Sequence, residues 1–406
     1  MRRLVTSPRV VTCDPARATA LDPLGAIDDG AVLIDEGAIV AVGHRAELAA
    51  RAADAEVVAF DGVVTPGLVD AHTHAPYVGS RDAEYALRMQ GKGYEEIAAA
   101  GGGIVASMRA VRAASVDELT RALVARLGRM RALGVTTVEC KSGYGLDLEN
   151  EMKQLEAVRR AAAVSDVRLV PTYLALHALP PEANGDRRAF SERVARAWLP
   201  KIAGEELASF VDAYIDRAAF TVDEARGLLE KGRELGLGLR VHAGQFDDVG
   251  AAMLAASVGA ASADHLEHVG DASIEAMARA GVRAVLLPIA SFTLGQSPPP
   301  VAALRAAGVN LVVASDANPG TAPTDSLPLA LALAVRTYGL TVAEAILGAT
   351  REAAASLGLA DVCGALRSGL AADVVAWDLP HEAGIVQPWG GPRVAAVFSA
   401  SGTRVR

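Results

Sequence analysis

The middle of the chain alternates short apolar runs with longer amphipathic segments, and this alternation limits the possible folds most strongly. The short runs are apolar or rich in β-branched residues, as is typical of strands that are buried on both faces. Eight such strands with helices between them predict an α/β fold, a (β/α)8 TIM-like barrel, with a doubly wound sheet as the alternative. The predicted strands span 68–72, 135–140, 167–174, 210–215, 238–242, 261–265, 283–288 and 310–315.

Three of the intervening helices are predicted to begin with the same signal. In each, a serine or threonine is followed three residues later by a glutamate, which is the pattern of a capping box. The pairs are Ser115 with Glu118, Thr221 with Glu224, and Thr341 with Glu344.

Short strands are also predicted at both ends of the chain. Residues 31–43 form an expected hairpin with an Asp-Glu-Gly turn, and 371–377 and 393–399 are expected strands. We predict that 1–63 and 360–406 form one small composite β-sandwich domain beside a barrel domain of 64–359. Two unrelated edge hairpins are the alternative.

Composition excludes several classes of protein. Of the 406 residues, 51% are hydrophobic and 21% are charged, so a large core can form and disorder is excluded. A net charge of −9 argues against a nucleic-acid or anionic-membrane binder.

The most apolar stretch, 326–335, is about half as long as a bilayer span. Three scattered cysteines fit a reducing compartment, and we expect an unprocessed cytoplasmic protein (Cys13, Cys140 and Cys363).

Histidines and an aspartate gather at the predicted strand ends. His72 and His74 follow the first strand at a spacing of two, so both imidazoles can face one metal ion. His242, His265 and Asp316 end three later strands, and in a barrel all strand ends meet at one mouth. Three histidines and one aspartate would form a mixed site that suits zinc or ferrous iron and leaves room for water. A pair of surface histidines is the alternative for the first motif.

Longer stretches around these residues are similar to a known family. They are TPGLVDAHTH (65–74), MQGKGYEEIAAAGGGI (89–104), ECKSGYGLD (139–147), ADHLEH (263–268), SDANPGT (315–321) and GLAADVVAWD (369–378). Over nearly its full length the chain resembles the imidazolonepropionase family of the amidohydrolase superfamily, whereas the His-x-His pair alone indicates only the superfamily. The resemblance implies hydrolysis of the cyclic amide of 4-imidazolone-5-propanoate to N-formimidoyl-L-glutamate, in histidine degradation.

The resemblance also implies roles for the strand-end residues. Asp316 would take a proton from the attacking water, and His265 would polarise the ring carbonyl. Some relatives have a glutamate three residues beyond the strand-five histidine, where this chain has Gln245. A glutamine cannot titrate, so we expect this catalytic-site residue to contact substrate or orient water. The implied ligands of one divalent ion, zinc or iron, are His72, His74, His242 and Asp316.

Substrate recognition is expected to centre on the propanoate. Arg81 follows the His-x-His motif, and its guanidinium could hold a carboxylate through two parallel hydrogen bonds; a solvated surface ion pair is the alternative. The Asn318–Thr321 turn is expected to face the ligand with its amide and N–H groups. The positions that match pocket residues of the family are Tyr94, Tyr144, His177, Asn318, Gly320 and Thr321.

The number of metal ions and the exact reaction leave alternatives. Two-metal relatives carry a bridging lysine or glutamate on a middle strand, whereas the predicted fourth strand offers Asp212 and Asp216 but no lysine, so we expect one ion. Lys141 and Glu139 are expected to form an ion pair that takes no direct part in catalysis. The alternatives are another deaminase or cyclic amide hydrolase of the superfamily, and a non-catalytic barrel scaffold. The expected partners are a small-molecule substrate and a second copy in a homodimer.

Overall fold

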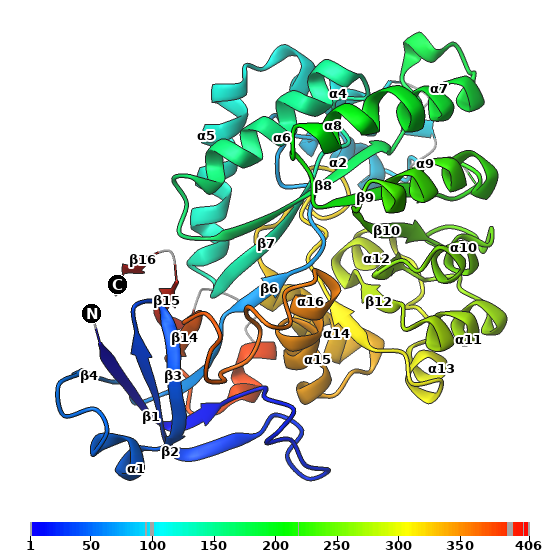
Figure 1. Ribbon diagram of the computed structural model, residues 1–406. Coiled ribbons are helices and arrows are strands. Elements are labelled where there is room, and N and C mark those ends of the chain that lie inside the picture. The colour runs from blue at the N-terminus through cyan, green and yellow to red at the C-terminus, as the bar shows by residue number, and fades with distance from the viewer. Residues whose placement is uncertain are drawn as a thin grey trace.

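The computed structural model describes residues 2–93, 96–97, 101–217, 219–387, 393–400 and 402–404. Within these residues the strands form two eight-stranded sheets. In Figure 1 the barrel and its helices occupy the upper right, and strands from both ends of the chain lie together at the lower left. The predicted (β/α)8 barrel is confirmed, and the predicted composite β-sandwich is a terminal domain whose described strands belong to one sheet.

The barrel sheet is parallel throughout, in the order β13-β12-β11-β10-β9-β8-β7-β6. It closes just beyond its first and last strands, where the Asp316 N–H donates to the His72 carbonyl at 3.0 Å and the His74 N–H donates to the Ala317 carbonyl at 3.0 Å. The seam of the barrel therefore passes through three predicted metal ligands. The strands are β6 Leu68–Asp70, β7 Val135–Lys141, β8 Arg168–Leu176, β9 Phe210–Ile215, β10 Gly238–Ala243, β11 Ser262–His265, β12 Arg283–Leu286 and β13 Leu311–Val313.

Helices surround this sheet, and all three predicted capping boxes are present, with reciprocal hydrogen bonds at Ser115, Thr221 and Thr341. Such a cap contributes about 1 kcal/mol. None of the described helices is long and apolar enough to cross a bilayer. The helices are α2 Asp82–Met89, α4 Ile104–Ala113, α5 Val116–Arg131, α6 Leu148–Ala162, α7 Arg187–Arg193, α8 Leu199–Gly204, α9 Val222–Glu234, α10 Ala251–Val258, α11 Asp271–Ala280, α12 Pro288–Leu294, α13 Val301–Ala306, α14 Leu327–Tyr338, α15 Val342–Gly348 and α16 Arg351–Ser356.

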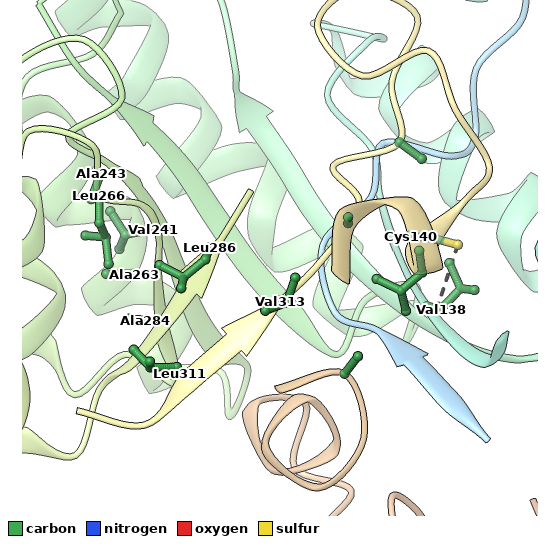
Figure 2. Close-up of a cluster of buried hydrophobic side chains, with 14 of the residues drawn as sticks. Val138, Cys140, Val241, Ala243, Ala263, Leu266, Ala284, Leu286, Leu311 and Val313 are labelled. Carbon is green, nitrogen blue, oxygen red and sulfur yellow. Dashed lines mark hydrogen bonds between the residues drawn. The ribbon is translucent and has the colours of Figure 1, made fainter. Parts of the chain in front are cut away.

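The outward faces of the strands carry the main hydrophobic core. Val241 and Ala243 of β10 and Leu286 of β12 belong to one buried cluster with Leu127 of α5 and Leu228 of α9. Figure 2 shows strand side chains of this cluster on β7 and on β10 to β13. Because side chains alternate along a strand, the residues between them face the barrel interior.

The interior near the start of the strands is also apolar. Phe210, at the start of β9, packs in a second cluster with Val170, Val285 and Val312. Ala353 of α16 belongs to the same cluster, so this helix covers the base of the barrel. The polar interior positions lie further along the strands, toward the mouth.

The terminal sheet joins both ends of the chain. Its order is β16-β15-β14-β5-β1-β2-β3, with β4 paired to β1, and β14 pairs antiparallel with β5. The predicted hairpin is β2–β3, whose turn residues Glu36 and Gly37 have φ of 46° and 81°, as a tight hairpin turn requires. We propose the division at 1–63, 64–359 and 360–406; β5 pairs within this sheet and leads through Gly67 to β6, the first barrel strand. The strands are β1 Arg3–Val11, β2 Ala26–Asp35, β3 Ala38–His44, β4 Glu56–Ala59, β5 Val63–Pro66, β14 Val374–Trp377, β15 Val394–Ser399 and β16 Gly402–Arg404.

Candidate metal centre and active site

Three histidines and an aspartate meet at the mouth of the barrel. His74 Nε2 lies 3.5 Å from His242 Nε2 and 3.4 Å from Asp316 Oδ1, and His72 Nε2 lies 3.5 Å from the same oxygen. The candidate ligand atoms of the three histidines all lie within 4.8 Å of one another. Tetrahedral ligands bonded to zinc at about 2.1 Å would lie about 3.4 Å apart, so these spacings suit a divalent ion.

The hydrogen bonding of the histidines also suits a metal ion. His72 Nδ1 lies 2.6 Å from Asp264 Oδ2, and His242 Nδ1 lies 3.0 Å from Asp212 Oδ2. A carboxylate accepts, so His72 Nδ1 carries the proton and its Nε2 lone pair faces the centre; the Asp212 carboxylate beside His242 Nδ1 favours the same tautomer there. His72 Nε2 is buried without a hydrogen-bond partner. Burial is the main cause that lowers the pKa of His72, which favours the neutral form that a metal ligand needs.

The backbone at two strand ends adopts an unusual conformation. His265, Leu266 and Asp316 have φ of 82°, 73° and 54°, in the left-handed region that residues other than glycine seldom occupy. Strain of this kind costs about 1–3 kcal/mol per residue and persists where the surrounding structure enforces it. Burial, the largest effect on Asp316, raises the pKa of its carboxyl, which makes the carboxylate a stronger base.

His72, His74 and His242 together are called the histidine cage below. His265 lies beside this cage, with its ring centroid 5.6 Å from that of His242. Burial lowers the pKa of His265, but the carboxylates of Glu267, Asp316 and Asp264 outweigh it, and the pKa is raised. Glu267 Oε2 lies 3.8 Å from His265 Nδ1, and its other oxygen accepts from the Ser291 hydroxyl. Our sequence analysis missed Glu267, although it lies within the quoted stretch ADHLEH.

A cavity beside the cage brings most predicted site residues together. Gly320 is not among its lining residues, but a Cβ there would lie 2.2 Å from Arg81 Nη1, so the glycine leaves room for the guanidinium. Tyr94 lies outside the described residues. Ile104, Tyr214 and Phe246 line the cavity and were not predicted. The predicted residues that line it are His74, Arg81, Tyr144, His177, His242, Gln245, His265, Asp316, Asn318 and Thr321.

His177 stacks on one of the cage histidines. Its ring lies 4.8 Å from the ring of His74 at 12°, and its Nδ1 lies 2.8 Å from the Gly143 carbonyl. Burial lowers the pKa of His177, so the ring is neutral, with the proton on Nδ1 and an acceptor at Nε2. Gly143 has φ of 105°, and a Cβ there would lie 2.9 Å from the Leu174 carbonyl oxygen, so this turn requires glycine.

Gln245 lies at the cavity with its carbonyl oxygen already engaged. The Tyr214 hydroxyl donates to Gln245 Oε1 at 2.8 Å. The amide therefore offers a ligand chiefly its N–H donors. The role of Gln245 in orienting a ligand, and not as a base, stays a prediction.

Arg81 is buried at the cavity but already holds a carboxylate. Its Nε and Nη2 lie 2.8 and 2.7 Å from Glu84 Oε2. The Gly103 N–H also reaches this carboxylate, at 3.1 Å to Oε1. A substrate carboxylate would therefore meet an arginine whose direction is fixed by Glu84.

The turn after Asp316 is organised by Asn318. Asn318 Oδ1 accepts from the N–H groups of Gly320 and Thr321, both at 2.8 Å. Its Nδ2 donates to the Asp316 carbonyl at 2.7 Å and to Thr321 Oγ1 at 3.0 Å. We expected these groups to face the ligand; instead they bond within the turn, because an Asn side chain readily bonds the backbone that follows it.

Comparison with known proteins agrees with this geometry. The model of the Amidohydrolase family matches residues 63–405. The imidazolonepropionase of Mesorhizobium japonicum is 46% identical over 370 residues, which cover 90% of each chain. That of Brucella suis biovar 1 is 43% identical over 383 residues, which cover 94% of each chain.

The chain belongs to the imidazolonepropionase family of amidohydrolases. A solved structure of a triazine hydrolase variant matches it with a TM-score of 0.78 over 100% of this chain and 94% of the other, at 19% identity. That likeness reflects the shared fold. Amidohydrolases are metal-dependent, and the cluster of His72, His74 and His242 is the described group that could hold the ion.

Proposed function

We propose that this enzyme hydrolyses 4-imidazolone-5-propanoate to N-formimidoyl-L-glutamate in histidine degradation. One observation carries the proposal: His74, His242, Asp316, His265 and Arg81 line one cavity in a chain of the imidazolonepropionase family. The bond that breaks joins the ring carbonyl carbon to the ring nitrogen. One water is added, so the carbonyl carbon becomes a carboxylate and the nitrogen becomes part of the formimidoyl group.

We propose that His72, His74, His242 and Asp316 hold one divalent ion, zinc or iron. When bound, such an ion would acidify water and polarise a carbonyl oxygen. The donor set of three neutral imidazoles and one carboxylate suits either metal.

Asp316 and His265 carry the proton transfers and charge stabilisation in this proposal. Asp316 accepts a proton from the attacking water, a role for which its buried carboxylate is placed because it lines the cavity beside His74 and His242. His265 donates a hydrogen bond to the oxygen that becomes negative as the ring carbonyl is attacked. Glu267 stabilises the protonated ring of His265, so this donor is present when the charge forms.

Ring opening needs a proton on the departing nitrogen. We propose that Asp316 returns the proton that it took from water, because Gln245 cannot supply one. His177 and Gln245 hold the polar edge of the ring, and Arg81 holds the propanoate. The homodimer and the cytoplasmic location remain predictions.

The direct test uses purified enzyme loaded with zinc and, separately, with ferrous iron. Each is mixed with 4-imidazolone-5-propanoate, and loss of the ring absorbance is followed together with formation of N-formimidoyl-L-glutamate by mass spectrometry. The proposal predicts equal rates for both signals. Binding without turnover in both metal forms would indicate a scaffold, and turnover of a purine or triazine ring alone would indicate another amidohydrolase.

A further inference from the structure

A layer of charged residues lies beneath the histidine cage, inside the barrel. All of its side chains have no exposed surface. Contacts within it join β7 to β9 and to β11, strands that are not neighbours, so the side chains cross the barrel interior. The members are Glu139 and Lys141 of β7, Asp212 of β9, Arg240 of β10 and Asp264 of β11.

Lys141 lies at the centre of this layer. Its Nζ lies 2.8 Å from Glu139 Oε1, 2.8 Å from Asp212 Oδ2 and 4.0 Å from Asp264 Oδ2. Burial lowers the pKa of Lys141, but the Asp212 and Glu139 carboxylates outweigh it and the pKa is raised. The amine therefore remains an ammonium ion in spite of its complete burial.

Each of these carboxylates also contacts a segment that carries a metal ligand. Asp212 contacts His242 Nδ1 at 3.0 Å, and Asp264 contacts His72 Nδ1 at 2.6 Å. Glu139 Oε2 accepts from the Thr73 N–H at 3.1 Å, in the middle of the His-x-His motif. One ammonium ion is thus connected to the imidazoles of His72 and His242 through two carboxylates, and to the backbone between His72 and His74 through the third.

The second cation of the layer cannot replace Lys141. Arg240 Nη2 lies 3.2 Å from Asp264 Oδ2, but its Nε is 4.0 Å from Glu139 Oε1. Among the contacts of the described residues, Lys141 is the cation paired with Asp212. Removing its charge would leave a buried carboxylate uncompensated, and that carboxylate could then turn away from His242.

We propose that Lys141 is a positioning residue of the metal centre. Through Asp264 and Asp212 it fixes the direction of the His72 and His242 rings, and through Glu139 it fixes the backbone of the His-x-His motif that carries His74. The inference rests on the proposed metal centre. Lys141 touches neither substrate nor reacting atoms, so its effect reaches the ion through the carboxylates. Partners of this kind commonly change metal affinity by about 10–100-fold.

The test is zinc affinity, measured on metal-free protein by competition with a chromogenic chelator. Lys141→Met keeps the length of the side chain and removes its charge, and we expect it to weaken zinc binding by about 10–100-fold. Lys153→Met is the matched control, because Lys153 on α6 donates to the carbonyls of Arg112 and Ala114, away from the cage. We expect the control to bind zinc as the wild type does.

Two further measurements separate positioning from simple packing. With Co²⁺ in place of zinc, Lys141→Met should shift the visible absorption bands, which report ligand geometry, whereas Lys153→Met should not. In a double-mutant cycle, Lys141→Met should weaken zinc binding less when Asp212→Asn is already present. The reason is that the neutral amide leaves no buried carboxylate for the Lys141 ammonium to compensate.

Zinc affinity of folded Lys141→Met within twofold of wild type would overturn the inference, as would independent effects in the cycle. If Lys141→Met does not fold, the zinc affinity of Asp212→Asn is the deciding measurement. Unchanged affinity would contradict the series of contacts from Lys141 through Asp212 to His242, and a loss of about tenfold or more would support it. Wild-type protein that binds no zinc or iron would overturn the metal centre itself, which is a different result.

Discussion

The inward-facing side chains of the barrel strands differ between the two ends of the barrel. Near the base, Phe210 of β9 packs with Val285 and Val312. Two residues further along β9, the polar Asp212 is buried in place of an apolar side chain, and on β10 the polar Arg240 and His242 are buried as well. The outward faces of these strands stay apolar along their length. Apolar packing at the base and on the outer faces therefore stabilises the barrel, whereas polar and charged side chains replace apolar ones near the mouth, where the site lies.

The largest expected effect is at the mouth. Asp316→Asn should lower kcat by about 10³-fold or more, because the amide cannot accept a proton from water. The fold should survive, since asparagine tolerates the left-handed backbone that Asp316 adopts. The value of kcat is measured from the loss of the ring absorbance, by stopped-flow or steady-state kinetics, and circular dichroism is the control for folding. A variant that keeps a tenth of wild-type kcat would remove Asp316 from the proton transfers.

A substitution in the outer core should show the opposite behaviour. Leu286 is fully buried in the cluster between strands and helices. Leu286→Ala should lower the free energy of unfolding by about 2–5 kcal/mol, because it leaves a cavity. Metal-loaded protein that remains folded should keep kcat within about twofold. A large loss of kcat with an unchanged free energy of unfolding would contradict the separation of a stabilising outer core from a catalytic mouth.

Substitution of Arg81 is expected to have a smaller effect, mainly on substrate binding. Arg81→Ala should cost about 2 kcal/mol, or roughly 30-fold, chiefly as a rise in KM. The control is Arg109→Ala, because this exposed arginine bonds the Gly101 carbonyl and does not line the cavity. An equal loss of activity on an analogue without the propanoate would show that Arg81 supports the fold of the mouth and does not bind the carboxylate.

The smallest effect is expected at Gln245. Gln245→Ala removes the acceptor of the Tyr214 hydroxyl and one polar contact, so kcat/KM should fall about fivefold, for about 1 kcal/mol. The pH profile of kcat/KM should keep its shape, because glutamine does not titrate. Unchanged kcat and KM would place Gln245 outside the site, and a shifted profile would give it a part in proton transfer.

The sequence predicted those parts of the molecule that depend on local pattern. The eight barrel strands and three capping boxes follow from periodicity and from residues three positions apart. His72 and His74 follow from the two-residue repeat of a strand, and the shared mouth of a barrel connects them with His242 and Asp316.

The expected ion pair between Lys141 and Glu139 is confirmed, but the rest of the charged layer could not be predicted in the same way, because its partners are far apart in the chain. His72 and Asp264 are separated by 192 residues, and their contact depends on barrel register. Two local features were missed although their signals were available. Glu84 lies three residues after Arg81 and pairs with it, and Asn318 begins a turn whose hydrogen bonds use its own amide.

Metal stoichiometry tests the central claim most directly. Equilibrium dialysis of the metal-free protein against zinc, followed by elemental analysis, should give one ion per chain for the wild type. His242→Ala should lose that ion while circular dichroism shows an intact barrel. Close to two ions per wild-type chain, or one tightly bound ion still present in the His242→Ala variant, would contradict a single ion held by His72, His74, His242 and Asp316.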